Sequence, residues 1–495
     1  MTTARASLTA AGAPRRLDFI DTVLVVVFLL GLYLGVSLAI SDKVPLTYAP
    51  SGFAGLIMLW RRRDQIVPKH LAGLLLVVTV YLCSVLAASD YSFLGKRFTG
   101  LLQLTYSLVI AYAMFLTLLQ GDRRQISRIL LIFCFAIIIG CLLEQYAGLR
   151  PVSDAVRERL YQMDQIYDAD LRDQVLYGRI RPKLFTSEPS AVTFAYTHFS
   201  AVWLVISPWR HKLLAYFGLI AMALVVLPGP TLVLMVFLTA PYLVFLVGTR
   251  PGGRTSISRT VGTLAFATVL VAAAVVFGSI FFAERLNELA TGRDASFFYR
   301  FTGPMLVAFD VFRNYPWAGA GLTGEPFIAN NVMNVYMNSP SFQAAWRITR
   351  IADVLTNYVW LHWIYLGLVW GVLSLVAVSV WLRLLGVPSV LYCWAVWITL
   401  GQASGAYVGP KTWTVMLIAA AASILAVDAL EQRHATRQAT IFRPGLACAS
   451  RDPRRRSSVK KESAPSSSES GAPVRDCFLS IHSSPIADAA MGEKV

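Results

Sequence analysis

Long hydrophobic runs alternate with short polar connections along most of the chain. A bilayer core of about 30 Å is crossed by roughly 20 helical residues. Twelve runs approach that length, so the pattern predicts eleven to thirteen transmembrane helices. The runs are Ile20–Ile40, Val44–Trp60, Leu71–Ala88, Phe98–Leu119, Ile129–Leu143, Ala191–Ser207, Leu213–Leu227, Thr231–Gly248, Val261–Ala283, Tyr358–Leu382, Pro388–Gly401 and Trp413–Leu430.

The composition argues against a soluble protein. Hydrophobic residues make up 56% of the 495 residues and charged residues only 15%, and the mean hydropathy is +0.58. Soluble globular proteins are about 25% charged. We therefore predict an all-α fold, a polytopic integral membrane helix bundle of about 12 transmembrane helices.

The basic residues indicate how the helices are oriented. The formal net charge is +16, but the cations sit beside hydrophobic runs without a nucleic-acid-binding motif, so we expect no nucleic-acid partner. With the N-terminus inside, sixteen cations fall in short inside segments and four in short outside loops: Lys43, Lys96, Arg97 and Lys411. This positive-inside bias places both termini in the cytoplasm.

The same topology defines three regions. A cytoplasmic segment covers residues 1–19, the transmembrane domain covers 20–430, and a Ser-rich tail with too little apolar content to fold covers 431–495. Two long polar loops, 144–190 and 284–356, both fall outside.

Both long loops contain amphipathic patterns, which predict helices that lie on the outer membrane surface and cover a cavity. One pattern consists of Val152, Val156, Leu160, Met163, Tyr167 and Leu171. The other, just before Asn314, consists of Met305, Leu306, Phe309 and Phe312.

The end of the first long loop concentrates charge. Arg179, Arg181 and Lys183 precede Glu188 just before the chain re-enters the membrane. Arginine's planar fork suits phosphate oxygens, and lysine adds a point charge. The cluster is therefore a candidate site for a pyrophosphate-lipid headgroup. On composition alone, a basic cluster that only anchors the next helix is the favoured alternative.

The second long loop contains Arg293, Arg300 and the glycines Gly319, Gly321 and Gly324. The glycines form a G-x-G-x-x-G pattern, but no strand precedes it, which argues against a dinucleotide site. We expect them to permit a tight turn and close approach to a ligand or to another helix.

Little else in the sequence carries chemistry. None of the six cysteines lies in a long polar loop and no C-x-x-C pair occurs, so we expect neither disulfides nor a metal site. His198 and His362 lie within hydrophobic runs, where a buried, hydrogen-bonded histidine is the default.

The order of these features resembles the bacterial O-antigen polymerase and O-antigen ligase superfamily of membrane glycosyltransferases. Arg181, then Phe185 and Glu188-Pro189-Ser190, is similar to an Arg…Phe-x-x-Glu-Pro-Ser pattern of polysaccharide polymerases, many of which have glycine where this chain has Leu184. Gly292-Arg293, Arg300 and the run from Pro316 to Gly321 resemble the second large periplasmic loop.

A third segment resembles the start of a helix that begins His-Asn in the ligases. Asn357 matches the asparagine, but the ligase histidine is replaced by Thr356. Successive side chains on a helix are rotated by about 100°. His362 is six residues further on and therefore faces a different side of the helix from Thr356. The missing histidine favours a polymerase over a ligase.

The resemblance implies glycosyl transfer at the periplasmic face of the bacterial inner membrane, without a cofactor or metal. The donor would be an undecaprenyl-pyrophosphate-linked oligosaccharide, the acceptor a second lipid-linked unit, and a chain-length regulator a further partner. Arg181 and Arg300 would stabilise the leaving pyrophosphate and Glu188 would activate the acceptor hydroxyl. Residues for substrate binding would be Arg179, Lys183, Arg293, Gly319, Gly321 and Asn357.

The sequence leaves other functions open. Glu188 could instead pair with a nearby arginine and hold the loop. A ligase that transfers finished polymer to lipid A–core is the alternative within the superfamily. A flippase or exporter of the lipid-linked unit and a non-catalytic assembly scaffold are alternatives from other classes.

Overall fold

The computed structural model describes residues 16–41, 44–162, 166–247, 297–339 and 351–441, with a few single positions between 262 and 276. The expected run Val261–Ala283, Met163, Arg293 and the tail beyond residue 441 lie outside the described residues. Contacts divide the chain into Met1–Ala435 and Thr436–Val495, and every candidate membrane span lies in the first unit.

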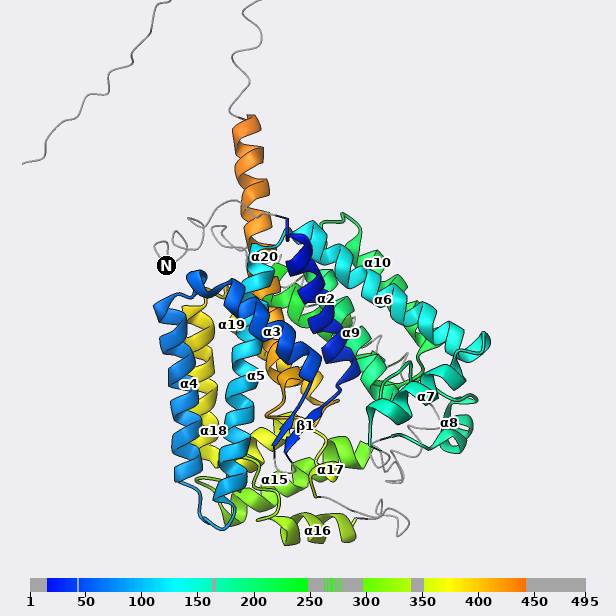
Figure 1. The fold of residues 1–495 in the computed structure, drawn as a ribbon. Helices are drawn as coiled ribbons and strands as arrows, with labels where there is room; N and C mark the ends of the chain where they lie inside the picture. Colours follow the sequence, from blue (N-terminus) through cyan, green and yellow to red (C-terminus); the bar gives the residue numbers. More distant parts are fainter. Residues whose placement is uncertain are drawn as a thin grey trace, which may run out of the picture. The chain divides into compact units, whose positions relative to one another are not determined.

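Helices dominate the described residues (Figure 1). Up to the first long loop they are α2 (Phe19–Leu34), α3 (Ala49–Arg61), α4 (Pro68–Leu86), α5 (Leu94–Gln120) and α6 (Arg123–Tyr146). Next come α7 (Arg150–Leu160), α8 (Asp170–Tyr177), α9 (Pro189–Ile206), α10 (Lys212–Val226), α11 (Val233–Pro241) and the π-helix η4 (Tyr242–Val247). Then follow the π-helix η5 (Phe298–Thr302), α15 (Gly303–Asn314), α16 (Ala329–Met337), α17 (Ile351–Val354), α18 (Tyr358–Leu384), α19 (Val390–Gly401) and α20 (Pro410–Ile441). Two 3-10 turns are η1 (Arg63–Gln65) and η3 (Pro230–Leu232).

Six of the described helices are long and apolar enough to cross a membrane, and four shorter ones are also apolar. The chain is therefore a membrane-embedded helical protein, and the count of about twelve spans stays a prediction. Protein buries 94% of the spanning window of α9 and 78% of that of α20, but only 39% for α4 and α6. The helices α9 and α20 thus belong to the centre of the bundle.

Neighbouring helices pack in pairs that are often distant in sequence. The helix α4 lies along α18, α2 along α3, α3 along α5 and α6 along α9 (Figure 1). The helix α18 bends at Gly367, whose φ of 63° and ψ of −163° are not helical. The backbone of the second long loop docks on this bend, where the N–H of Leu368 donates to the carbonyl of Pro316.

The first expected span is shorter than its hydrophobic run. The helix α2 ends at Leu34, where Gly35 adopts a left-handed φ of 71° and donates its N–H to the carbonyl of Gly31, a common helix C-terminus. The chain then forms an antiparallel hairpin of β1 (Leu38–Ser41) and β2 (Val44–Leu46), with Leu38 opposite Leu46. This hairpin is a small addition to the predicted all-α fold.

One loop helix is confirmed and the other is not continuous. The helix α15 contains all four apolar positions predicted for it. The single helix predicted from Val152 to Leu171 is wrong, because α7 ends at Leu160 and α8 begins only at Asp170. Between them, the N–H of Tyr167 donates to the carbonyl of Ser187 at 3.0 Å. This long-range bond replaces the helical one that the local pattern favours.

Candidate functional site

The segment from Lys183 to Glu188 leads into α9, and buried side chains hold its backbone. The carboxylate of Glu144 on α6 accepts the N–H groups of Lys183 and Leu184 at 2.9 and 2.5 Å. The hydroxyl of Ser153 on α7 accepts the N–H of Phe185 at 3.0 Å. Three successive backbone donors of this segment are therefore satisfied by side chains.

Arg157 on α7 holds the carbonyl groups of the same segment. Its Nε donates to the carbonyl of Thr186 at 2.8 Å and its Nη2 to that of Ser187 at 3.1 Å. The side chain is buried and its Nη1 also donates to Asp154 at 2.6 Å. Arg157 thus fixes the chain immediately before Glu188.

This arrangement maintains a backbone conformation that the residues themselves disfavour. Leu184 and Phe185 have φ values of 35° and 64°, and a left-handed conformation costs a non-glycine residue about 1–2 kcal/mol. Such strain persists only where the surroundings over-determine it. Leu184, the departure from the polymerase-like pattern, therefore occupies a position that suits glycine.

The two central cations of the basic cluster are paired within their own loop. Nη2 of Arg181 lies 2.8 Å from the carboxylate of Asp173, which is fully buried. It also donates to the hydroxyl of Tyr167 at 3.1 Å. Lys183 lies 3.0 Å from the carboxylate of Asp170.

Burial lowers the pKa of Arg181, but the hydrogen bond to Asp173, together with electrostatic interactions with Tyr177, Asp173 and Tyr167, outweighs burial, so the pKa is raised overall. The guanidinium therefore keeps its charge. The positive charges of Arg181 and Lys183 are largely compensated by carboxylates of α8.

The outer members of the cluster point in different directions. Arg179 donates through Nη2 to the carbonyl of Val225 at the end of α10. Glu188 is exposed and precedes α9, but its side chain does not cap that helix. Its carboxylate instead accepts from the hydroxyl of Ser190. Glu188 is therefore the carboxylate of this cluster that is presented to the surroundings.

Arg300 lies on η5 in the second loop, and Asn357 holds the backbone at that residue. The buried Nδ2 of Asn357 donates to the carbonyl of Arg300 and to Oε1 of Gln402, both at 2.8 Å. Its Oδ1 caps the first turn of α18, and the neighbouring Thr356 donates to the carbonyl of Tyr299 at 3.0 Å. Asn357 therefore joins η5, α18 and the end of α19, and it holds the backbone carbonyl of Arg300.

Gly319 allows the second loop to dock on the bend of α18. Its φ is 59°, and an added Cβ atom would lie 2.5 Å from the carbonyl oxygen of Ile364. The next residue, Ala320, donates its N–H to that carbonyl at 2.8 Å, and the N–H of Leu368 reaches the carbonyl of Pro316 at 2.8 Å. Gly319 therefore makes the predicted close approach, and its partner is a helix.

Gly321 makes a similar approach to a buried arginine. Its φ is 79°, and an added Cβ would lie 2.4 Å from Nε of Arg97. Arg97, on α5, is fully buried and donates to the carbonyl of Ala320 at 2.8 Å. The segment between α15 and α16 accordingly contacts the first turn of α5, where the hydroxyl of Thr323 donates to the carbonyl of Lys96 at 3.1 Å; Figure 1 shows these elements at the same end of the bundle. Both glycines contribute to packing between elements.

A lysine at the start of α20 (Pro410–Ile441) interacts with residues of both long loops. Lys411 is half-buried, and its Nζ lies 3.7 Å from the ring centroid of Phe194 on α9. Its charge interacts electrostatically with both Glu188 and Arg300. Glu188 also interacts electrostatically with Tyr48, the residue before α3. Lys411 thus interacts electrostatically with one predicted residue of each long loop.

In the sequence, Lys411 stands out only as a loop cation. The available signal is its place directly after Pro410, at the start of the last hydrophobic run. A lysine there is also what an ordinary interfacial anchor would show, so sequence alone does not distinguish the two roles.

The two intramembrane histidines lie in the protein interior. The ring of His362 is 2.9 Å from the hydroxyl of Tyr407 and 3.2 Å from the carbonyl of Gly371, which confirms the buried, hydrogen-bonded default. His198 is buried on α9. Among the described residues, no group of three His, Cys, Asp or Glu side chains could hold a metal ion.

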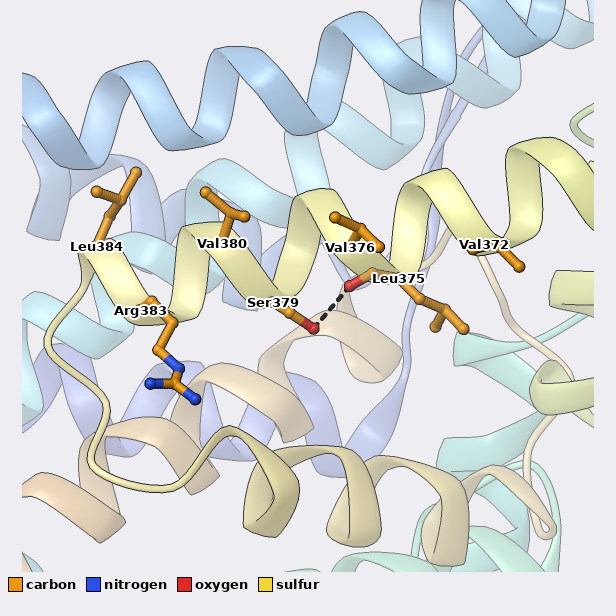
Figure 2. Close-up of a pocket in the computed structure, with 7 residues that line it drawn as sticks. All are labelled: Val372, Leu375, Val376, Ser379, Val380, Arg383 and Leu384. Carbon is orange, nitrogen blue, oxygen red and sulfur yellow. Dashed lines mark hydrogen bonds between the residues drawn. The ribbon is translucent and has the colours of Figure 1, made fainter.

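A groove elsewhere on the surface has a different character. Figure 2 shows its lining, which comes entirely from the C-terminal half of α18 and is apolar apart from Ser379 and Arg383. Ser379 donates to the carbonyl of Leu375 at 2.7 Å. The groove lies more than three helical turns beyond Asn357, and an apolar surface of this kind suits lipid rather than a charged substrate.

No protein-family model matches this chain, and no curated protein is similar enough to match it.

Proposed function

We propose that this protein is a membrane glycosyltransferase that polymerises lipid-pyrophosphate-linked oligosaccharide units. The observation that supports the proposal is that the charge of Lys411 interacts electrostatically with both Glu188 and Arg300. These residues come from two separate loops and from the start of a central helix. Glycosyl transfer from a pyrophosphate can use a carboxylate that accepts the acceptor's proton and cations that stabilise the leaving group.

In the proposed reaction, the bond between the anomeric carbon and the pyrophosphate oxygen breaks. A new bond forms between that carbon and a hydroxyl oxygen of the acceptor unit. The hydroxyl proton passes to the carboxylate of Glu188, which is exposed and so accessible to an acceptor. The lipid pyrophosphate leaves with the bonding electron pair, and Arg300 stabilises the negative charge that develops on it.

The remaining candidate residues take supporting roles in this proposal. Arg181 and Lys183 are paired with Asp173 and Asp170, so they hold the loop that presents Glu188. Asn357 holds the backbone of Arg300. Arg179 and Arg293 remain predicted supports for the pyrophosphate, and Arg293 lies outside the described residues.

The proposed location is the bacterial inner membrane, with both loops in the periplasm and both termini in the cytoplasm. The positive-inside bias of the short segments supports this orientation. The proposed partners are the undecaprenyl-pyrophosphate-linked substrates, surrounding membrane lipid and a chain-length regulator.

A ligase is less well supported than a polymerase. The position of the ligase histidine is occupied by Thr356, whose hydroxyl donates to the carbonyl of Tyr299. A hydroxyl engaged in this way does not replace an imidazole as an acid or base. A flippase or exporter remains the alternative from a different class.

The test is mass spectrometry of lipid-linked glycans from a strain that lacks the gene, complemented with wild type or single variants. The expected result is accumulation of single repeat units that a non-permeant glycosidase can reach from the periplasm. Glu188→Gln and Arg300→Ala should fail to restore polymer. Arg313→Ala, which changes an exposed arginine at the end of α15, is the matched control and should restore it.

Three other results would replace the proposal. Long polymer retained on the lipid carrier would indicate a ligase. Single units protected from the glycosidase would indicate a flippase. Full polymer from both Glu188→Gln and Arg300→Ala would indicate a scaffold.

A further inference from the structure

The ammonium group of Lys411 lacks an anionic partner in the described part of the chain. No carboxylate oxygen among those residues lies within 4 Å of it, and its closest recorded contact is the aromatic face of Phe194 at 3.7 Å. An aromatic face attracts a cation by about 0.5–2 kcal/mol. Partial burial still removes water from the charged group, which costs free energy. A bound anion would offset that cost.

Other lysines near the two loops are paired. Lys96 lies 3.0 Å from the carboxylate of Glu325, and Lys183 lies 3.0 Å from that of Asp170. Both pairs link parts of the chain and leave little charge for a ligand. Lys411 differs because its charge interacts at longer range with Glu188 and Arg300.

On the membrane side of Lys411, the described neighbour that interacts with it is a histidine and not a carboxylate. His198 lies one helical turn beyond Phe194 on α9, is buried, and also interacts electrostatically with Lys411. An imidazole carries no negative charge in either protonation state. Among the described residues, Glu188 is the carboxylate that interacts with Lys411, and it does so at longer range than an ion pair. Lys411 therefore retains the capacity to bind an anionic ligand.

The position of Lys411 along α20 indicates at which depth in the membrane an anionic ligand would bind. It is the second residue of a helix whose first 20 residues can span a membrane, so it lies at the level of lipid headgroups. The first turn of a helix also carries partial positive charge from its free N–H groups. Arg300 lies outside the spanning segments, on η5 in the second loop.

We infer that Lys411 binds the phosphate group through which a prenyl pyrophosphate is joined to its lipid, a contact that complements Arg300. The inference rests on the proposed function and names a further substrate-binding residue for it. Together Lys411, Arg300 and Glu188 carry a net charge of +1. The carboxylate repels the pyrophosphate, so the anion lies on the side of the two cations and Glu188 stays accessible to the acceptor.

The experiment measures binding of farnesyl pyrophosphate and of inorganic pyrophosphate to the purified full chain in detergent. Lys411→Met removes the charge at similar length and should weaken farnesyl pyrophosphate binding about tenfold or more, as expected for a lost charge-assisted hydrogen bond. Lys411→Arg keeps the charge and should stay within about threefold of wild type, which separates loss of charge from misfolding.

Lys212→Met is the matched control. Lys212 also begins an apolar helix, α10, and its Nζ lies 4.9 Å from the ring centroid of Tyr242. This variant should bind both probes as wild type does. Wild type should bind farnesyl pyrophosphate at least tenfold more tightly than inorganic pyrophosphate, since the lipid-linked compound is the inferred ligand.

Unchanged binding in Lys411→Met would overturn the inference and leave the proposed function to be judged by the glycan analysis. Equal wild-type affinity for the two probes would assign the site to free phosphate and overturn the lipid assignment. Absence of any binding to wild type would count against the proposed donor itself.

Discussion

Arg181 and Lys183 in the first long loop each lie within about 3 Å of a carboxylate of that loop, whereas the second loop depends on close backbone contacts. There Asn357 and Thr356 hold the carbonyls of η5, and Gly319 docks on α18. The first loop is thus organised mainly by charge and the second mainly by shape. The difference shows that a charged residue of a motif need not face a substrate, because an ion pair within the protein can already compensate its charge.

The largest effect should follow from removing the partner of Arg181. Asp173→Asn leaves a mostly buried guanidinium uncompensated, which costs about 3–5 kcal/mol. We expect a large drop in the thermal unfolding midpoint in detergent and loss of polymer. The double variant Asp173→Asn, Arg181→Met removes both charges and should recover most of the stability and polymer. A stable double variant without polymer would instead place Arg181 against the substrate.

Gly319→Ala should have the next largest effect and acts on the second loop. The added methyl would meet the backbone of α18, and overpacking costs about 1–3 kcal/mol, with about 1–2 kcal/mol more for the positive φ. Thermal unfolding should detect a loss of about 3 kcal/mol. Gly218→Ala, in α10 with no atom within 4 Å of the added Cβ, is the control and should be neutral or slightly stabilising. Equal behaviour of the two variants would contradict the docking.

Glu144→Gln tests whether the strained turn depends on its buried acceptor. An amide can offer one oxygen where the carboxylate offers two, so one backbone N–H of Lys183 or Leu184 loses its partner at a cost of about 1–3 kcal/mol. We expect reduced stability and reduced polymer output in the complemented strain. Glu158→Gln, an exposed change on α7, is the control and should match wild type. Wild-type polymer from Glu144→Gln would show that the turn does not need this carboxylate.

Thr356→Val should have the smallest effect. It removes the hydrogen bond to the carbonyl of Tyr299, worth about 1 kcal/mol. Thr356→Ser keeps the hydroxyl and should retain wild-type stability. Polymer output should fall modestly in Thr356→Val, because η5 and Arg300 would be held less firmly. Indistinguishable stability of the two variants would mean that this bond contributes nothing to the second loop.

Local patterns predicted the elements they control directly. Hydrophobic length predicted the helices α4, α5, α9 and α18 to within four residues at each end. The three- and four-residue spacing gave α15. The same spacing failed between α7 and α8, because Tyr167 bonds to Ser187, twenty residues away.

The candidate site was predictable in its residue types but not in their roles. The charges of Arg181, Lys183 and Glu188 are visible in the sequence, but the carboxylates of α8 that pair with Arg181 and Lys183 are determined by how the loop folds back. The glycine pattern indicated that the backbone approaches another element closely. Only the fold showed that Gly319 contacts α18 and that Gly321 contacts Arg97.

By itself, the sequence determined that this chain is a helical membrane protein with two polar loops. The reason is that hydrophobicity and its spacing along the chain are local properties, which can be read without knowing the fold. Tertiary structure alone decided which charges are compensated and which remain exposed. It also brought Lys411 within electrostatic range of Glu188 and Arg300, although the three lie more than 100 positions apart in the chain. The physical reason is that Coulomb and hydrogen-bond interactions depend on distance in space, which sequence spacing does not specify.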